Sequence, residues 1–314
     1  MEIMESAVVS TTEEPLVRIE HFGMSFGRVE VIRDLSFEIR RGETFGFLGG
    51  NGSGKTTTIR ALLGIYQPTR GLLHIDGREF SPDNGDRLGY LPEERGLYQK
   101  ESVIDVMTYF GKLKGLGRAT ASRWSQDYLE RVGLADKAKA RVDKLSQGQQ
   151  QKVQLGVTIM NSPELLILDE PTKGFDPVNR RLLMDIIEDQ KRTGATVMMV
   201  THQMEEVERL CDRILLLKDG TARAYGTVDD VRSEFGGTRI DIDHDEIVPT
   251  SDAYRVLTAD AGHTVLEVSN DADTAAILRS LVAAGVGVRR FTPTLRSLDD
   301  IFVEVYGADA MEGN

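Results

Sequence analysis

The chain has 314 residues, of which 40% are hydrophobic and 28% are charged, a composition typical of a folded protein and too apolar for a disordered one. Its 38 basic and 50 acidic side chains give a net charge of −12, which argues against a protein whose main task is to grip nucleic acid. The single cysteine, Cys211, excludes an internal disulfide framework and a cysteine-rich zinc site. No apolar run approaches the roughly 18–20 residues that span a bilayer, and the acidic N-terminus is unlike a secretory signal. These features predict a cytosolic chain that reaches a membrane only through a partner.

In chain order, a polar tail over residues 1–15 is expected to be disordered, and LVRIEHF, LSFEIR and TFGFLG are then predicted as strands. LLIL (165–168) and TVMMV (196–200) are short continuous apolar runs, typical of strands that are buried on both faces of a largely parallel sheet. Helical patterns alternate with the strands over 55–64, 148–161, 178–192 and 203–210. This alternation predicts an α/β layered core over residues 16–236, with a helical subdomain inserted at about 98–162.

The composition changes after Arg232. The segment 236–252, GGTRIDIDHDEIVPTSD, is rich in glycine and acidic residues, and we interpret it as a boundary. Beyond it, YRVLTAD, HTVLEVS and VGVRRFTP are predicted as strands, with helices near 273–284 and 297–305. Residues 237–314 are therefore predicted to form a small α+β accessory domain.

The strongest chemical signal is a glycine-rich loop that matches GxxxxGK[ST]. This phosphate loop consists of Gly49, Gly50, Asn51, Gly52, Ser53, Gly54, Lys55 and Thr56, and Thr57 follows it. Glycines let backbone N–H groups turn toward phosphate oxygens, and a helix that starts near Lys55 adds its positive N-terminal end. We expect Lys55 to reach the β- and γ-phosphates of a nucleotide and the Thr56 hydroxyl to ligate Mg²⁺.

A second signal is the pair of carboxylates in LLILDEP. The apolar strand delivers Asp169 and Glu170 at its end, where open α/β sheets place ligand chemistry. We expect Asp169 to hold Mg²⁺ and Glu170 to polarise the water that attacks the γ-phosphate. A strand that ends in Asp-Glu is weak evidence by itself, but it becomes strong beside the phosphate loop.

The third signal is LSQGQ, formed by Leu145, Ser146, Gln147, Gly148 and Gln149. By itself it is a polar turn in which Ser146 caps a helix. It also resembles the LSGGQ signature of the ATP-binding-cassette (ABC) ATPases, whose motif order is matched over about residues 16–235. The resemblance implies a P-loop ATPase fold, with a mixed sheet core and a helical subdomain, that binds ATP with Mg²⁺. It also implies that the signature contacts the γ-phosphate of ATP held by another copy.

The resemblance assigns roles to further residues. Phe26 matches the aromatic residue that stacks on adenine, Asp176 matches the loop that communicates across the dimer, and His202 matches the switch histidine that hydrogen-bonds the γ-phosphate. Glu93 stands where the family has a glutamine that touches Mg²⁺ and the attacking water. Since a carboxylate is a hard oxygen donor that can still ligate Mg²⁺, activity is expected to survive with altered coupling or metal dependence.

Other positions depart from the commonest family pattern. Gly50 stands in place of proline and Gln147 in place of the first signature glycine, while Lys173 and Phe175 lie where serine and leucine are common.

The resemblance also implies partners. One copy supplies the phosphate loop of one site and the signature of the other, so two copies would form a homodimer around two ATP molecules. The chain is similar to ATPase subunits of bacterial exporters, which work with a separate integral-membrane permease at the inner face of the cell membrane. We expect the permease near Tyr98, Val103, Met107 and Phe110, although these apolar positions fit a core equally well.

Several alternatives remain open at this point. The chain could be a soluble cassette protein that acts on ribosomes or nucleic acid, although its charge argues against direct binding of nucleic acid. It could be an ATP-binding scaffold without turnover, or it could serve import. The helix in SLDDIF could pack on its own strands, extend the dimer interface or regulate closure.

Overall fold

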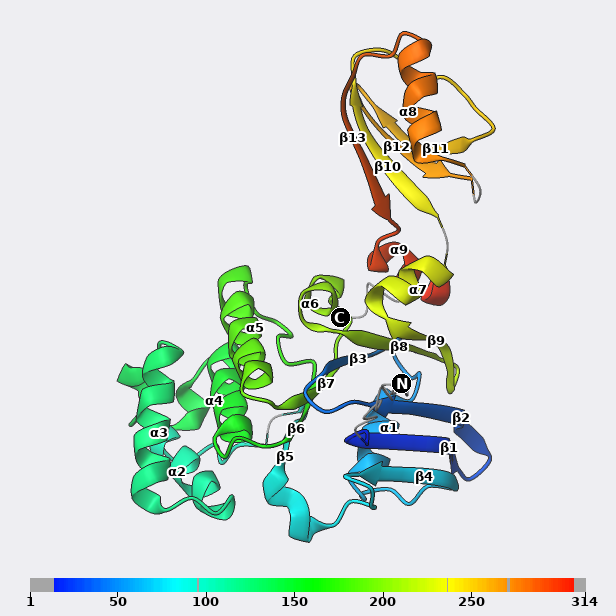
Figure 1. Ribbon diagram of the computed structural model, residues 1–314. Helices are drawn as coiled ribbons and strands as arrows, with labels where there is room; N and C mark the ends of the chain where they lie inside the picture. The colour runs from blue at the N-terminus through cyan, green and yellow to red at the C-terminus, as the bar shows by residue number, and fades with distance from the viewer. Residues whose placement is uncertain (1–13, 95, 236, 270–271, 308–314) are drawn as a thin grey trace, which may run out of the picture. The chain divides into compact units, whose positions relative to one another are not determined.

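The computed structural model describes residues 14–94, 96–235, 237–269 and 272–307, and the chain divides into two compact units between Arg223 and Ala224 (Figure 1). The division lies inside a strand, earlier in the chain than the change in composition near residue 236.

Within the described residues, nine strands form one sheet in the order β4-β1-β2-β9-β8-β3-β7-β6-β5. Strands β3, β5, β6, β7 and β8 pair with one another in parallel, whereas β1 is antiparallel to β2 and β4. The mixed sheet confirms the α/β core that the sequence predicted. The strands have these bounds: β1 Val17–Phe26, β2 Val29–Ile39, β3 Thr44–Gly49, β4 Arg70–Ile75, β5 Leu88–Leu91, β6 Leu165–Asp169, β7 Thr196–Val200, β8 Arg213–Lys218 and β9 Thr221–Thr227.

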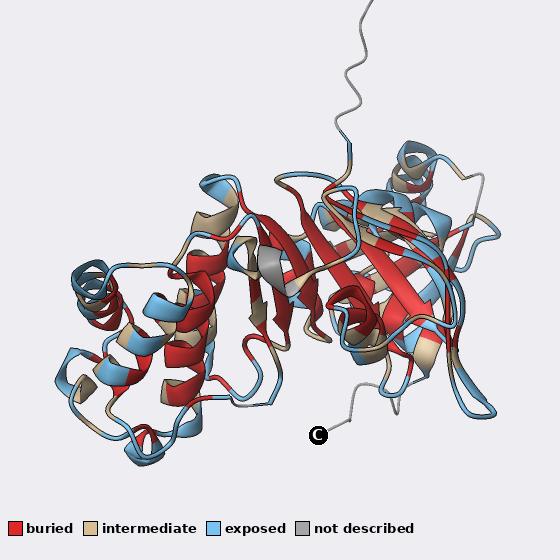
Figure 2. Ribbon diagram, turned by 90° about the horizontal axis from the view of Figure 1, so that it is seen from below, coloured by how far each residue is buried: buried red, intermediate tan, exposed pale blue. Residues whose placement is uncertain are grey.

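The central strands are buried along their lengths. Every residue of β3, β6 and β7 is buried, as the continuous apolar runs predicted, and these strands are red in Figure 2. Strand β8 carries the same signal in RILLLK, with its first five residues buried. Because the order β8-β3-β7-β6 places these strands side by side, they form the rigid centre of the unit.

Helices cover this sheet and form a separate helical layer between β5 and β6. The helices have these bounds: α1 Lys55–Leu62, α2 Val103–Leu113, α3 Arg118–Arg131, α4 Gln147–Ile159, α5 Pro177–Arg192 and α6 Met204–Leu210. The four helical ranges predicted from the sequence agree closely with α1, α4, α5 and α6. Helices α3 and α4 approach closely because Gly156 has no side chain, and a Cβ there would lie 2.4 Å from the ring of Tyr128. Val103 and Met107 of α2 are fully buried in this core, so they offer no surface to a permease.

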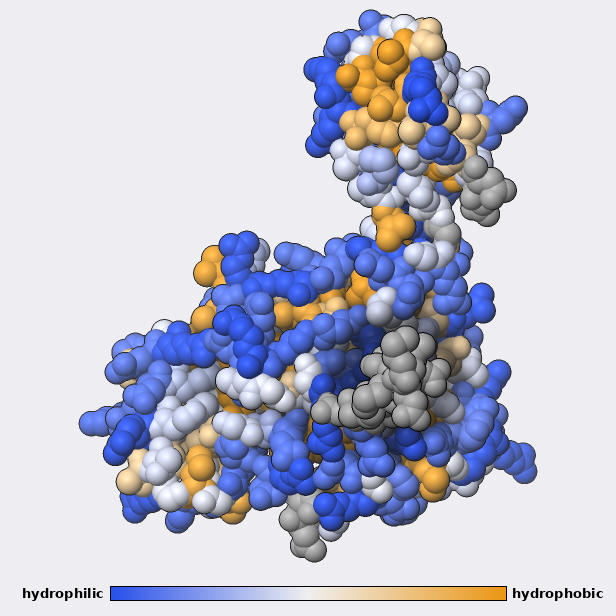
Figure 3. All heavy atoms as spheres, viewed as in Figure 1, coloured by the Kyte–Doolittle hydropathy of each residue, from blue (hydrophilic) through white to orange (hydrophobic). Residues whose placement is uncertain are grey.

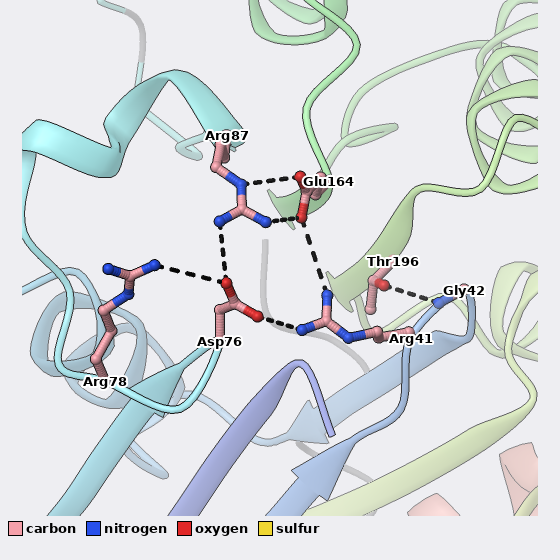
Figure 4. A network of polar contacts seen from close by, with 7 residues as sticks. All are labelled: Arg41, Gly42, Asp76, Arg78, Arg87, Glu164 and Thr196. Atoms are coloured by element: carbon pink, nitrogen blue, oxygen red, sulfur yellow. Dashed lines mark hydrogen bonds and ion pairs between the residues drawn. The ribbon is translucent and has the colours of Figure 1, made fainter. Parts of the chain in front are cut away.

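An ion-pair network joins several segments at the amino edge of the parallel strands (Figure 4). Asp76, after β4, accepts hydrogen bonds from Arg41 and from Arg87, the latter at 3.0 Å. Arg87, just before β5, also donates from Nε to Glu164, just before β6, at 2.8 Å. The phosphate loop follows the carboxyl end of β3, so the network lies at the opposite edge of the sheet from that loop.

In the second unit, four antiparallel strands form a sheet in the order β11-β12-β10-β13. The elements of this unit have these bounds: α7 Val228–Glu234, β10 Thr238–His244, β11 Tyr254–Asp260, β12 His263–Val268, α8 Thr274–Ala283, β13 Val288–Leu295 and α9 Leu298–Tyr306. The three later strands and the last two helices confirm the prediction. The interpretation of 236–252 as a boundary was wrong in part, because β10 is an inner strand of this sheet.

Strand β10 belongs to the sheet because its side chains alternate. Ile240, Ile242 and His244 are buried, whereas Asp241 and Asp243 between them are only half-buried. The two isoleucines pack in a core with Ile277 and Leu281 of α8, among others. The glycines before the strand and its aspartates concealed this alternation, which was nevertheless present in the sequence.

Candidate active site

The sequence-predicted motifs lie at one edge of the sheet. Strands β3, β7 and β6 are neighbours and run parallel, so their carboxyl ends share an edge. The phosphate loop follows β3, Asp169 ends β6 with Glu170 next to it, and His202 follows β7. Residues far apart in the sequence are thereby collected where open parallel sheets bind ligands.

The phosphate loop has the backbone conformation that its glycines permit. Gly52 and Gly54 have φ values of 76° and 110°, a region that disfavours side chains. Gly54 is also confined by packing, because a Cβ there would lie 2.3 Å from Cδ1 of Ile32. Helix α1 begins at Lys55, as expected, so its amino end faces the loop.

The side chains of this loop are poised for an anion. Lys55 lies across the loop and donates to the carbonyl oxygens of Gly49 at 2.7 Å and Gly50 at 3.0 Å. Burial lowers the pKa of Lys55, while the carboxylates of Glu170 and Asp169 oppose that shift. The hydroxyl oxygen of Ser53 is buried and has no hydrogen-bond partner among the described residues. A phosphate group would give Lys55 a negatively charged partner and would give the Ser53 hydroxyl a hydrogen-bond acceptor.

The two acidic residues at the carboxyl end of β6 differ in environment. Asp169 is only 4% exposed, and burial, followed by the charges of Glu170 and Glu93, raises its pKa to about 6. Glu170 has a φ of 48°, which is unusual for a residue with a side chain, and its N–H donates to the carbonyl of Val200 at 2.8 Å. A backbone held in this region at the end of a strand is a form of strain found at functional sites.

His202 contacts Glu170 directly. Its Nδ1 lies 2.9 Å from Oε1 of Glu170, and this hydrogen bond raises the pKa of the imidazole. The turn that carries His202 is tied to the turn after β6 by Glu206, which is fully buried and accepts from Thr172 and from Thr201, the latter at 3.1 Å. Sequence reasoning missed Glu206, since a glutamate inside MEEVERL gives no sign of being buried.

Glu93 and Lys173 form an ion pair, with 3.0 Å between Oε1 and Nζ. Both residues were singled out in the sequence as departures from the family pattern, but their pairing was not foreseen. The pair joins the segment after β5 to the turn after β6, about 80 residues apart in the sequence.

Phe26 lies at the surface, 45% exposed, in an aromatic pair with Tyr66. Their ring centroids are 5.3 Å apart, and Arg60 lies over the ring of Tyr66 at 5.9 Å. The exposed ring of Phe26, which belongs to the same unit as the phosphate loop, is available for stacking. Tyr66 was missed in the sequence because it lies in no motif.

The signature opens helix α4 with a capping box. Ser146 Oγ accepts from the N–H of Gln149 at 3.3 Å, and Gln149 Oε1 accepts from the N–H of Ser146 at 2.9 Å. Leu145 is buried, and a Cβ on Gly148 would lie 3.1 Å from the ring of Phe175, whereas Gln147 is exposed. The predicted cap is therefore confirmed, and it leaves the amino end of the helix accessible.

Asp176 is also a helix cap. It precedes α5, and its Oδ1 accepts from the backbone N–H groups of Val178 and Asn179, both at 3.0 Å. These hydrogen bonds lower the pKa of Asp176, and the bond from the N–H of Asn179 has the largest effect. The side chain is exposed, so it can be reached from outside the chain.

The residues proposed for Mg²⁺ fit that ion. Among the described residues no group of three or more histidine, cysteine or acidic side chains could hold a metal by itself. The expected set has two carboxylates, Asp169 and Glu93, and the hydroxyl of Thr56. Such a sparse oxygen set suits Mg²⁺, which keeps waters and takes further ligands from substrate phosphates.

Comparison with known proteins identifies the family. A family model described as "ABC transporter" matches residues 32–173, and one described as the C-terminal domain of DrrA1-3-like ATP-binding proteins matches residues 226–306. The uncharacterized ABC transporter ATP-binding protein YhaQ of Bacillus subtilis is 35% identical over 93% of this chain and 99% of its own length. The chain belongs to the ABC transporter ATP-binding proteins. The resemblance seen in the sequence is thereby confirmed.

Two further ABC proteins extend the comparison. Nod factor export ATP-binding protein I of Cupriavidus metallidurans is 33% identical over 90% of this chain and 95% of its own. A solved ATP-binding subunit of an ABC transporter superposes with a TM-score of 0.66 at 30% identity, covering 70% of this chain and 93% of that one. ABC ATP-binding proteins hydrolyse ATP to power transport, so the chain is an ATPase.

Proposed function

We propose that the chain is the motor subunit of an exporter, in which two copies close around two Mg·ATP and drive a separate integral-membrane permease. The observation that carries this proposal is the Glu170–His202 pair at the edge shared with the phosphate loop. Glu170 orients the attacking water and accepts its proton, His202 holds the Glu170 carboxylate in place through their hydrogen bond, and Lys55 neutralises charge that develops on the γ-phosphate. Thr56, Asp169 and Glu93 would hold Mg²⁺, which would supply electrostatic stabilisation of the phosphates.

A homodimer is supported by the presence of both kinds of nucleotide-binding motif in a single chain. It carries a phosphate loop and a signature whose capped helix end is accessible, and Asp176, which is exposed, would communicate between copies. The signature of each copy then completes the site of the other. Phe26 stacks on the adenine of the nucleotide bound to its own copy.

Export through a permease is supported by the relatives and by one surface. No helix in the described ranges is long and apolar enough to cross a membrane, and hydrophilic residues cover most of the larger unit in the view of Figure 3. Tyr98 and Tyr109 are nevertheless 53% and 45% exposed, and their ring centroids lie 5.6 Å apart, with Phe110 against both. These three residues form the docking surface that we propose for the permease, which would hold the chain at the inner face of the membrane.

The rival function on ribosomes or nucleic acid finds no support in the relatives or in the charge of −12. The deciding experiment recovers the tagged full chain from detergent-solubilised native membranes and compares the ATPase rates of wild type and Glu170→Gln. Recovery of a multi-span protein, with turnover lost in the variant, is the expected result. Turnover without such a partner, and with ribosomes or nucleic acid in the eluate, would contradict the exporter.

A further inference from the structure

The ion pair between Glu93 and Lys173 stands at the edge of the proposed metal site. Lys173 lies three residues after Glu170, and its N–H donates to the carbonyl of Glu170 at 3.2 Å, so its position is set by the same turn. Its side chain is 42% exposed and that of Glu93 is 49% exposed, which leaves both free to exchange partners.

The charge of Glu93 acts on the centre of the site. It raises the pKa of Asp169, although burial and the charge of Glu170 have larger effects, and it favours the charged form of Lys55. The three carboxylates are therefore within electrostatic reach of one another and of two lysines. With His202 neutral, Lys55 and Lys173 leave a net charge of −1 on this group, and without Lys173 the charge would be −2.

We propose that Lys173 is an internal counterion of Glu93 that sets the affinity of the site for its divalent cation. This inference rests on the proposed function. The Lys173 ammonium group pairs with the Glu93 carboxylate when no divalent cation is bound. A cation that uses the same carboxylate oxygen as a ligand must first displace the ammonium group. Lys173 is thus a positioning residue. Its positive charge also reduces the repulsion between the Glu93 carboxylate and the polyphosphate that the site must bind.

The expected effect is modest, because both side chains are partly exposed to water. Exposed ion pairs contribute at most about 1 kcal/mol, so Lys173→Met should lower the cation concentration needed for half-saturation by about threefold to fivefold. Lys173→Arg keeps the charge and should stay near wild type. In a Glu93→Gln background the carboxylate is gone, and Lys173→Met should then have little effect.

The test uses the full chain with Mn²⁺ as the probe and a fluorescent non-hydrolysable ATP analogue at a fixed concentration that gives little binding without the cation. Free Mn²⁺ is titrated and the half-saturation point is read from the bound fluorescence, so the readout does not depend on turnover. Lys137→Met is the matched control, since Lys137 is 43% exposed and pairs with Asp136 at 2.9 Å in the helical subdomain. Melting curves of each variant establish that it is folded.

The double-mutant cycle separates the outcomes. A shift in Lys173→Met that disappears with Glu93→Gln, while Lys137→Met matches wild type, supports the inference. No shift, or an equal shift with and without the Glu93 carboxylate, overturns it and leaves the proposed function intact. Failure of wild type to bind the analogue at any Mn²⁺ concentration overturns the proposed function and the inference together.

Discussion

Replacing His202 by alanine tests whether the imidazole works through Glu170. The hydrogen bond between them is 2.9 Å long, and the side chains of His202 and Glu170 are only 31% and 12% exposed, so water replaces it poorly. A hydrogen bond to a charged group contributes about 1.5–3 kcal/mol, and we therefore expect kcat to fall about 10- to 150-fold. Affinity for the nucleotide should change less, because the interaction positions the base for the chemical step.

The assay measures steady-state ATP hydrolysis at saturating Mg·ATP, with affinity measured separately by a fluorescent analogue. Glu170→Gln keeps the size of the side chain and removes the base, so its rate should fall about 10²- to 10⁴-fold. The double variant should be scarcely slower than Glu170→Gln alone, because the two groups act as a unit. Multiplicative losses in the double variant would refute the reasoning and show that His202 acts on the reaction independently of Glu170.

Three predictions concern stability, each measured by denaturant unfolding at pH 7 and, for Asp76→Asn, also at acid pH. Asp76→Asn should lower the free energy of unfolding by about 1 kcal/mol with an unchanged ATPase rate. Hydrogen bonds, of which that from Arg41 has the largest effect, lower the pKa of Asp76 in the folded chain. The stability difference between wild type and Asp76→Asn should therefore be complete above pH about 3.9, the pKa of an unfolded aspartate, and should disappear as the pH falls through the lower pKa of the folded chain. Gly156→Ala should cost about 1–3 kcal/mol, because its Cβ would collide with the ring of Tyr128; a neutral result would contradict the close packing of α3 and α4. Ser146→Ala should cost about 1 kcal/mol through loss of the cap, and equal stability would contradict the capping box.

How far the sequence predicts this molecule depends on whether a signal is local. Strands β3, β6 and β7 were predictable because burial on both faces favours a nearly continuous apolar run in each of them. The phosphate loop and the two acidic residues after β6 were predictable because their spacing is fixed by the turn that carries them. Local patterns thus gave most of the core and the main chemical groups.

Contacts between distant segments were not predictable in this way. Glu206 is buried because two turns from different strands meet over it, and its own helix shows nothing unusual. Lys173 could be noted as unusual, but its distance from Glu93 depends on how β5 and β6 lie side by side. Val103 fitted either a docking surface or the core until the packing of α2 placed it in the core.

The place of β10 in its sheet has a consequence for the order of events during synthesis. Its partner β13 begins about 40 residues later, so at about 5–20 residues per second the ribosome exposes β10 for roughly 2–9 s before that edge can pair. An open strand edge during such an interval is a template for aggregation, and charged side chains along it are a known protection. Asp241 and Asp243, which conceal the strand in the sequence, are charges of this protective kind on β10.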